Sequence, residues 1–144
     1  FEFYSAVAAV MALLHDVLIV LSFYAIFNIP VDSSFIAVIL TIVGYSVNDT
    51  IVIFDRIREN LKVMKQASFE DIANISITQS ITRTVNTSLT TLLTITALYF
   101  LGGETIRDFT SALIVGISAG TYSSIFIASS LWLILRGKTR IANA

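Results

Sequence analysis

Four long apolar segments set the strongest limit on how this chain can fold. They cover residues 3–27, 34–54, 77–101 and 109–135. A helix needs about 20 apolar residues to cross the roughly 30 Å hydrocarbon core of a bilayer, and each segment reaches that length. Charged residues make up only 13% of the chain, whereas about a quarter of a typical soluble domain is charged. We therefore predict an all-α membrane protein, with one transmembrane domain over residues 1–144 built as a bundle of four transmembrane helices.

Turn residues and basic residues arrange these segments as two hairpins with a predicted orientation. Pro30 lies between the first two segments, and Gly102 and Gly103 lie between the last two, so each pair is expected to form an antiparallel hairpin. Most basic residues lie in the middle connection, residues 55–76, or in the C-terminal tail: Arg56, Arg58, Lys62, Lys65, Arg136, Lys138 and Arg140. The positive-inside rule places both regions in the cytoplasm. A plainer interpretation, in which these charges are a solvated face that only sets topology, stays open.

The middle connection has a pattern of its own. Ile57, Leu61 and Met64 recur at helical spacing among charges, which predicts a short amphipathic connecting helix at the cytoplasmic interface. Ser68 is followed three residues later by Asp71, which resembles a capping box. The third helix is therefore expected to begin near Phe69, before its apolar part.

Asp49 and Arg83 are charged residues placed inside apolar segments. An Asp at the centre of a membrane helix costs about 2.5 to 3.5 kcal/mol, so it marks a candidate functional site whose partner must be found. Asp49 precedes Asp55 by six residues, and Arg83 follows Ile77 by six residues. Because the second and third helices run in opposite directions, both side chains are expected at similar depth in the cytoplasmic half of the membrane. We predict that both turn inward.

Further polar residues accompany this pair. A stripe on the third segment recurs at spacings of three and four: Gln79, Arg83, Asn86 or Thr87, Thr90 and Thr94. The second segment supplies Tyr45 and Asn48 beside Asp49. Such a stripe is expected to face other helices or water, which predicts a hydrated seam between the second and third helices. Two interpretations stay open: a proton relay, in which helix movement changes the Asp49–Arg83 separation, and a static ion pair that fastens the helices.

His15 and Asp16 form another ionisable pair, near the midpoint of the first segment. Adjacent helical residues point about 100° apart, so these two are not arranged as a chelating pair. The chain has one histidine and no cysteine, and we expect no metal site. We expect the pair to hydrogen-bond to neighbouring helices, and a second station on a proton path is the alternative.

The fourth segment carries packing signals. Gly116 and Gly120 lie on a small-residue face that allows another helix to approach closely. Trp132 lies near the end of the same segment, where an interfacial aromatic anchor is expected. Both features predict a structural role.

Several long motifs resemble one known family. GYSVNDTIVIFDRIREN begins at Gly44, HDVLIVL precedes it, and QSITRTVNTSLTTLL and FTSALIVGISAGTYSSIFIAS follow it. In this order they resemble the membrane portion of SecF in the SecD/SecF family of the bacterial Sec protein-export machinery, which is related to the resistance-nodulation-division transporters. The resemblance covers essentially the whole chain. It identifies the chain as the last four helices of such a protein, a fragment without the first two helices and the periplasmic domain.

The resemblance implies a function and a set of partners. SecF pairs with SecD or is fused to it, associates with the SecYEG translocon, and uses the proton motive force to help move exported preproteins across the bacterial inner membrane. The acid and the arginine of the matching family motifs, Asp49 and Arg83 here, are implicated in proton movement. We expect protons and membrane lipid as further partners, but no nucleic acid, no cofactor and no enzymatic activity. Two alternatives are an efflux-type transporter subunit of the same superfamily and a structural subunit that stabilises the translocon without moving protons.

Overall fold

The computed structural model describes residues 2–142, with the side chains of residue 2 and of residues 138–142 left aside. Lys138 and Arg140, two of the basic residues expected in the C-terminal tail, therefore lie outside the described side chains. The elements in chain order are α1 (Glu2–Ile26), α2 (Ser33–Val63), α3 (Phe69–Leu101), the 3-10 turn η1 (Glu104–Ile106), α4 (Arg107–Tyr122), the π-turn η2 (Ser123–Ile127) and α5 (Ala128–Ala142).

Four stretches of these helices are long and apolar enough to cross a membrane. They are Phe3–Ile26, Ser33–Val63, Phe69–Leu101 and Glu104–Gly137, and the last of them joins η1, α4, η2 and α5. The described part of the chain contains helices and turns but no strand. The prediction of an all-α bundle of four membrane helices is confirmed.

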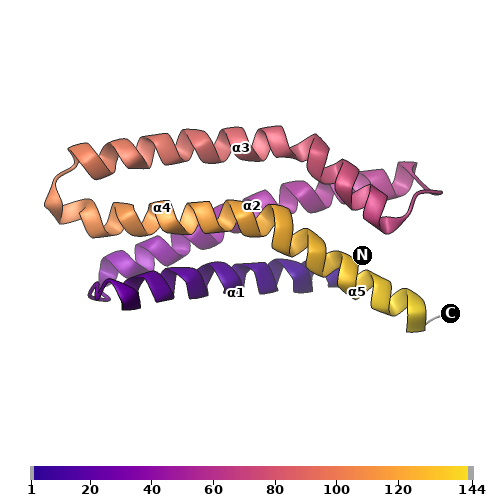
Figure 1. The fold of residues 1–144 in the computed structure, drawn as a ribbon, viewed down its shortest axis with the longest axis horizontal. Coiled ribbons are helices and arrows are strands. Elements are labelled where there is room, and N and C mark those ends of the chain that lie inside the picture. The colour runs from indigo at the N-terminus through magenta and orange to yellow at the C-terminus, as the bar shows by residue number, and fades with distance from the viewer. Residues whose placement is uncertain (1, 143–144) are drawn as a thin grey trace.

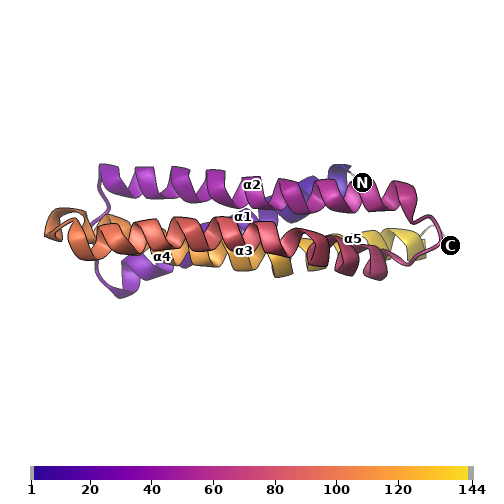
Figure 2. The ribbon, with the colours of Figure 1, turned by 90° about the horizontal axis from the view of Figure 1, so that it is seen from above.

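The helices run side by side along the long axis of the molecule (Figure 1). The α1–α2 turn and the α3–α4 connection lie at one end, and the α2–α3 loop lies at the other end with both termini. Helices α2 and α4 each contact α1 and α3 as well as one another, so these two helices occupy the middle of the bundle. The view from above shows α2 and α3 on either side of the bundle axis (Figure 2).

The connection between α2 and α3 is much shorter than residues 55–76. Helix α2 continues to Val63, and α3 begins at Phe69, where the Ser68 hydroxyl caps it by accepting a hydrogen bond of 3.2 Å from the Asp71 N–H. The prediction of a separate amphipathic connecting helix was wrong, because that segment forms the last turns of α2. Leaving the apolar segment does not end a helix when its apolar face, here through Ile57, still packs on the bundle.

Two apolar clusters fill the bundle, and a layer of buried polar side chains separates them. The first cluster lies toward the α2–α3 loop and is centred on Trp132, and the second lies toward the opposite end and is centred on Ile42. Along each helix, the residues between the two clusters include buried polar ones, which we call the polar layer: Asp16, Ser46, Asp49, Thr50, Ser80, Thr84, Ser88, Ser123 and Ser124.

Trp132 belongs to the core and not to the membrane interface. Its side chain is completely buried and makes an edge-to-face contact with Phe69, with ring centroids 6.0 Å apart. The prediction that Trp132 is an interfacial anchor was therefore wrong. The first turn of α3 extends far enough along the bundle to cover the indole with Phe69.

Candidate functional site

Asp49 is one of two buried carboxyl groups in the polar layer. Its side chain lies on α2 and is 4% exposed. The Oδ2 atom is buried and has no hydrogen-bond partner among the residues that the structure describes. A buried polar atom without a partner is costly, and such atoms in native proteins call for a physical explanation.

Arg83 lies on the neighbouring helix α3, but its side chain is exposed. It lines a groove of about 310 Å³ between α2 and α3, together with Val52, Asp55, Arg56, Glu59, Gln79 and Ser80. No ion pair within 4.0 Å joins the two described side chains. The expectation that both turn inward is thus met by Asp49 and was wrong for Arg83.

The rest of the predicted polar stripe lies on the outside of this four-helix unit. Its exposed members are Asn48 on α2 and Gln79, Asn86, Thr87, Thr90 and Thr94 on α3. The three threonine hydroxyls donate to carbonyls of their own helix at 2.8 to 3.0 Å. The Gln79 Oε1 atom accepts a hydrogen bond of 3.0 Å from the Asn60 side chain. The stripe was predicted to form the seam between α2 and α3. In the structure these residues lie outside that contact.

Smaller hydroxyl residues occupy the inward face of α3 instead. Ser76, Ser80, Thr84 and Ser88 follow one another at a spacing of four and are all buried. Small side chains let membrane helices approach closely, which explains why they displace the larger Gln79 and Asn86 from the contact. The α2–α3 contact is polar, as predicted, but it is made by different residues.

Tyr45 is the member of the predicted seam that does connect helices. Its hydroxyl donates a hydrogen bond of 2.9 Å to the Ser88 hydroxyl on α3. The Ser88 Oγ atom lies 2.6 Å from Thr121 Oγ1 on α4. This chain of three hydroxyls links α2, α3 and α4.

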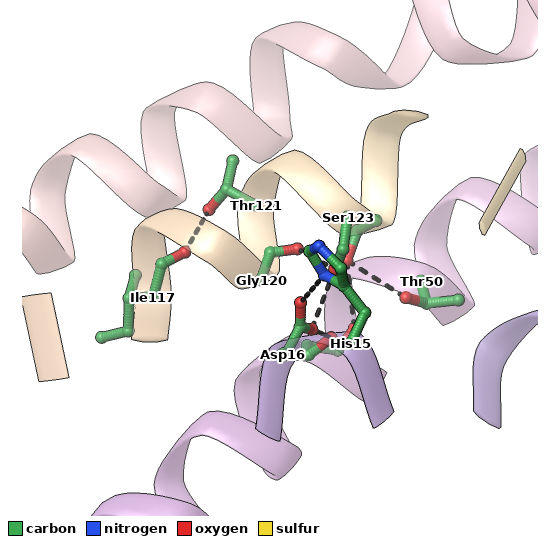
Figure 3. A network of polar contacts seen from close by, with 9 residues as sticks. His15, Asp16, Thr50, Ile117, Gly120, Thr121 and Ser123 are labelled. Atoms are coloured by element: carbon green, nitrogen blue, oxygen red, sulfur yellow. Dashed lines mark hydrogen bonds and ion pairs between the residues drawn. The ribbon is translucent and has the colours of Figure 1, made fainter. Parts of the chain in front are cut away.

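Asp16 is the other carboxyl group of the polar layer, and it is completely buried. Its Oδ2 atom accepts hydrogen bonds from the Ser46 hydroxyl at 2.6 Å and from the Ser123 hydroxyl at 2.8 Å. Its Oδ1 atom lies 3.1 Å from His15 Nδ1, and Figure 3 shows the two side chains together beside Ser123. Asp16 thus bonds to two neighbouring helices, as expected, while His15 bonds to Asp16.

The π-turn η2 brings more hydroxyls to the same place. Thr50 Oγ1 on α2 lies 3.1 Å from the Ser124 hydroxyl, which is also 3.3 Å from the Ser46 carbonyl oxygen. Sequence reasoning missed the roles of Ser46, Thr50 and Ser123. The spacing of four between Ser46 and Thr50 would have indicated a shared face of α2, whereas no residue type signals the π-turn that carries Ser123.

Gly116 and Gly120 lie at close helix contacts, as their spacing predicts. A β-carbon on Gly116 would overlap Ile42, and one on Gly120 would lie 3.7 Å from Asp16 Oδ2. No group of three or more His, Cys, Asp and Glu side chains arranged for a metal ion occurs among the described residues. The site is therefore a set of two carboxyl groups, one arginine, one histidine and a network of hydroxyls.

Comparisons with known proteins agree with this architecture. The family model for "Protein export membrane protein SecD/SecF, C-terminal" matches residues 1–138. The protein translocase subunit SecF of Alicyclobacillus acidocaldarius is 51% identical over 96% of this chain, which covers 46% of that protein. The subunit SecDF of Bacillus subtilis is 45% identical over 96% of this chain, which covers 19% of it.

Solved structures give the same result. A crystal structure of SecDF in a super-membrane-facing form superimposes with a TM-score of 0.95 at 46% identity, over 99% of this chain and 20% of that one. A second structure of SecDF, from Thermus thermophilus, gives a TM-score of 0.91 at 48% identity, over 95% of this chain and 19% of that one. The chain spans about half or less of the length of the curated relatives it matches. On these matches and its four-helix membrane fold, the chain belongs to the SecD/SecF family of protein export membrane proteins.

Proposed function

We propose that this chain is the C-terminal membrane part of a SecF-type protein translocase subunit, and that Asp49 binds and releases protons there during preprotein export. The observation that carries this proposal is the Asp49 carboxyl, buried in a membrane-spanning helix with one oxygen left without a hydrogen bond. A carboxyl group in that setting is far less costly to bury when it is protonated than when it is ionised.

The distance between Arg83 and Asp49 is the quantity that a movement of α3 along α2 can change. An approaching positive charge favours the ionised form of a carboxyl group, and a retreating charge favours the protonated form. No ion pair joins the described side chains of Arg83 and Asp49, and Arg83 lines a groove between α2 and α3. A shift of α3 along α2 would therefore bind or release a proton at Asp49. A static fastener would instead bring the two groups into direct contact.

The exposed polar stripe on α3 points to a partner inside the membrane. Gln79, Asn86, Thr87 and Thr90 are exposed on a helix that is long and apolar enough to span the bilayer. Polar side chains in membrane helices face partner helices or water-filled cavities. We assign this surface to SecD, because relatives such as the Bacillus subtilis protein carry the name SecDF and are about five times as long as this chain.

The wider setting follows from the relatives and the charges. The Thermus thermophilus structure is described as a translocon-associated membrane protein, which supports SecYEG and exported preproteins as partners. The basic residues of the α2–α3 loop region, Arg56, Arg58, Lys62 and Lys65, favour a cytoplasmic position for that loop and for the C-terminus. The chain would then lie in the bacterial plasma membrane as a multi-pass segment.

The test uses the full-length protein with SecD and the translocon in vesicles under a proton motive force. Asp49→Asn and Arg83→Met are expected to lower proton flux about 100-fold or more, the usual range for loss of a proton-transfer group, and to abolish the stimulation of export. Asp108→Asn and Lys65→Met are matched controls that each remove a charge from the exposed ends of the bundle. Normal flux and export in both Asp49→Asn and Arg83→Met would reduce the pair to a structural contact.

A further inference from the structure

We propose that His15 and Asp16 form a second proton-binding site, which is coupled to Asp49 through the π-turn η2. The link to transport rests on the function proposed above, whereas proton binding by the pair does not. The site is built from α1, α2 and η2, and all three contribute a side chain that touches the Asp16 carboxyl or its ligands (Figure 3).

The contacts of Asp16 suit an ionised carboxylate when His15 Nδ1 carries a proton. Two hydroxyl groups, from Ser46 and Ser123, donate to Oδ2, and the His15 ring nitrogen Nδ1 lies at hydrogen-bond distance from Oδ1. A carboxylate accepts hydrogen bonds at both oxygens, whereas a carboxylic acid would need an acceptor for its own proton. A completely buried carboxylate is costly unless a positive charge accompanies it.

His15 can provide that positive charge. The Asp16 carboxylate favours the tautomer with a proton on Nδ1, which leaves Nε2 to bind the exchangeable proton. The His15 side chain is 34% exposed and the Asp16 side chain is 0% exposed, so the ring is the member that meets the surroundings of the bundle. Proton uptake on Nε2 changes the pair from a net charge of −1 to zero without breaking the hydrogen bond.

The geometry connects this pair to Asp49. Ser46 precedes Asp49 by one helical turn, and Thr50 follows Asp49 directly. Ser46 shares the Asp16 carboxylate with Ser123, and Thr50 contacts Ser124. Ser123 and Ser124, the first two residues of η2, are therefore linked to the α2 residues that lie before and after Asp49 in the sequence.

A change of charge at the pair would be felt at Asp49 through these contacts. Hydrogen bonds to an ionised group are roughly twice as strong as those between neutral groups. When His15 binds a proton, it draws the Asp16 charge toward Oδ1 and weakens the hold of Oδ2 on Ser46 and Ser123. A π-turn is an irregular segment that often occurs at functional sites. Here the side chains of η2 contact Asp16 and Thr50, the neighbour of Asp49, so η2 connects the surroundings of the two carboxyl groups.

Few other charged groups face this pair. From α2 the titratable residues near Ser46 are Tyr45, whose hydroxyl donates to Ser88, and Asp49. From α4 and η2 the titratable side chains are Tyr122, which is 55% exposed, and Arg107 and Asp108 in the first turn of α4, about three helical turns or more before Gly120. From α5 it is Arg136, which lies over the Tyr4 ring at the opposite end of the first apolar cluster. Among the described residues, His15 is therefore the basic side chain in contact with Asp16.

Two measurements on the full-length protein with SecD test the proposal. The first follows the ring of His15, the one histidine of this chain, by nitrogen-15 NMR, with His15→Gln identifying its signals by difference. Asp16→Asn is expected to change the pH dependence of the His15 ring signals, because the negative partner is lost. The second measures proton flux in vesicles as a function of pH. Two titration steps are expected in the wild type and one in His15→Gln.

The outcomes separate this proposal from a structural role and from the proposed function. Asn keeps the size of Asp16 but has one acceptor oxygen in place of two, so a merely structural Asp16 would lower the stability of Asp16→Asn and leave the pH profile of the flux unchanged. His15→Gln changes a partly exposed residue and keeps the test decisive if Asp16→Asn fails to fold. A His15 titration independent of Asp16, or an unaltered flux profile in His15→Gln, would overturn the proposal. A wild-type protein without any flux would refute proton transport, while the NMR titration would still decide whether the pair binds a proton.

Discussion

Gly116 on α4 lies directly against Ile42 on α2. A β-carbon on Gly116 would overlap the Ile42 side chain and would lie 3.2 Å from the Val20 Cγ2 atom on α1. Three helices meet at this point because one of them has no side chain there. The middle position of α4 in the bundle depends on this contact.

Replacing Gly116 by alanine is expected to destabilise the bundle. The added methyl group forces Ile42 or a helix to move, and overpacking of this kind costs about 1–3 kcal/mol. Gly44→Ala is the matched control, because a β-carbon on Gly44 meets nothing within 4 Å. It should leave the unfolding midpoint unchanged or raise it, since alanine is favoured over glycine in helices by about 1 kcal/mol. Thermal unfolding of the two variants in detergent measures both effects, and equal midpoints would contradict the packing argument.

Tyr45→Phe is expected to weaken the link between α2 and α3. It removes the donor of the 2.9 Å hydrogen bond to Ser88 and keeps the ring in place. Hydrogen bonds between membrane helices contribute about 0.6 kcal/mol on average, so a loss of that order in the free energy of unfolding is expected. Tyr122→Phe is the control. Tyr122 is the last residue of α4 and its side chain is exposed, so the free energy of unfolding should not change. A loss of similar size in both variants would argue against the Tyr45–Ser88 bond.

Hydropathy predicted the number and type of the helices, but it missed where they end. The apolar part of the second segment stops near Phe54, whereas α2 continues to Val63. Hydropathy reports the depth at which a segment meets water, and a helix with one packed face can continue beyond that depth. The start of α3 was predicted well, because Ser68 and Asp71 carry a local signal.

The candidate site was harder to predict than the fold. Residue type and depth were enough to single out Asp49 as a buried acid, but not to give the direction of Arg83. The spacing of the polar stripe on the third segment predicts that it faces other helices or water. In the structure, small hydroxyl residues such as Ser80 and Ser88 take the inner face, while the larger Gln79 and Asn86 lie outside. A sequence of one chain cannot distinguish an inner contact from a surface that a second protein covers.

Trp132→Ala is expected to be among the most destabilising single changes. The indole is completely buried and packs edge-to-face on Phe69, so its removal leaves a cavity between α5 and the start of α3. Replacing a buried Trp or Phe by alanine typically costs about 3–5 kcal/mol. Phe126→Ala, on a side chain that is 55% exposed, is the control and should cost much less. If the two variants unfold alike, Trp132 acts at the surface and not in the core.

Thr84→Val tests whether a buried hydroxyl on the inner face of α3 has a partner. The Thr84 side chain is 1% exposed, and its Oγ1 atom has no hydrogen-bond partner among the described residues. Valine has the same shape without the hydroxyl, so the substitution is expected to stabilise the protein by about 1 kcal/mol, the lower end of the cost of an unpaired buried polar group. Ser88→Ala, four residues further on the same face, removes a hydroxyl bonded to Tyr45 and Thr121 and should destabilise. The opposite signs follow from hydrogen bonding, because both side chains are buried on the inner face of α3 and, among the described residues, only the Ser88 hydroxyl has hydrogen-bond partners on α2 and α4. A Thr84→Val protein that unfolds more easily than wild type would mean that the hydroxyl is paired in the full-length protein, through water or a helix outside this chain.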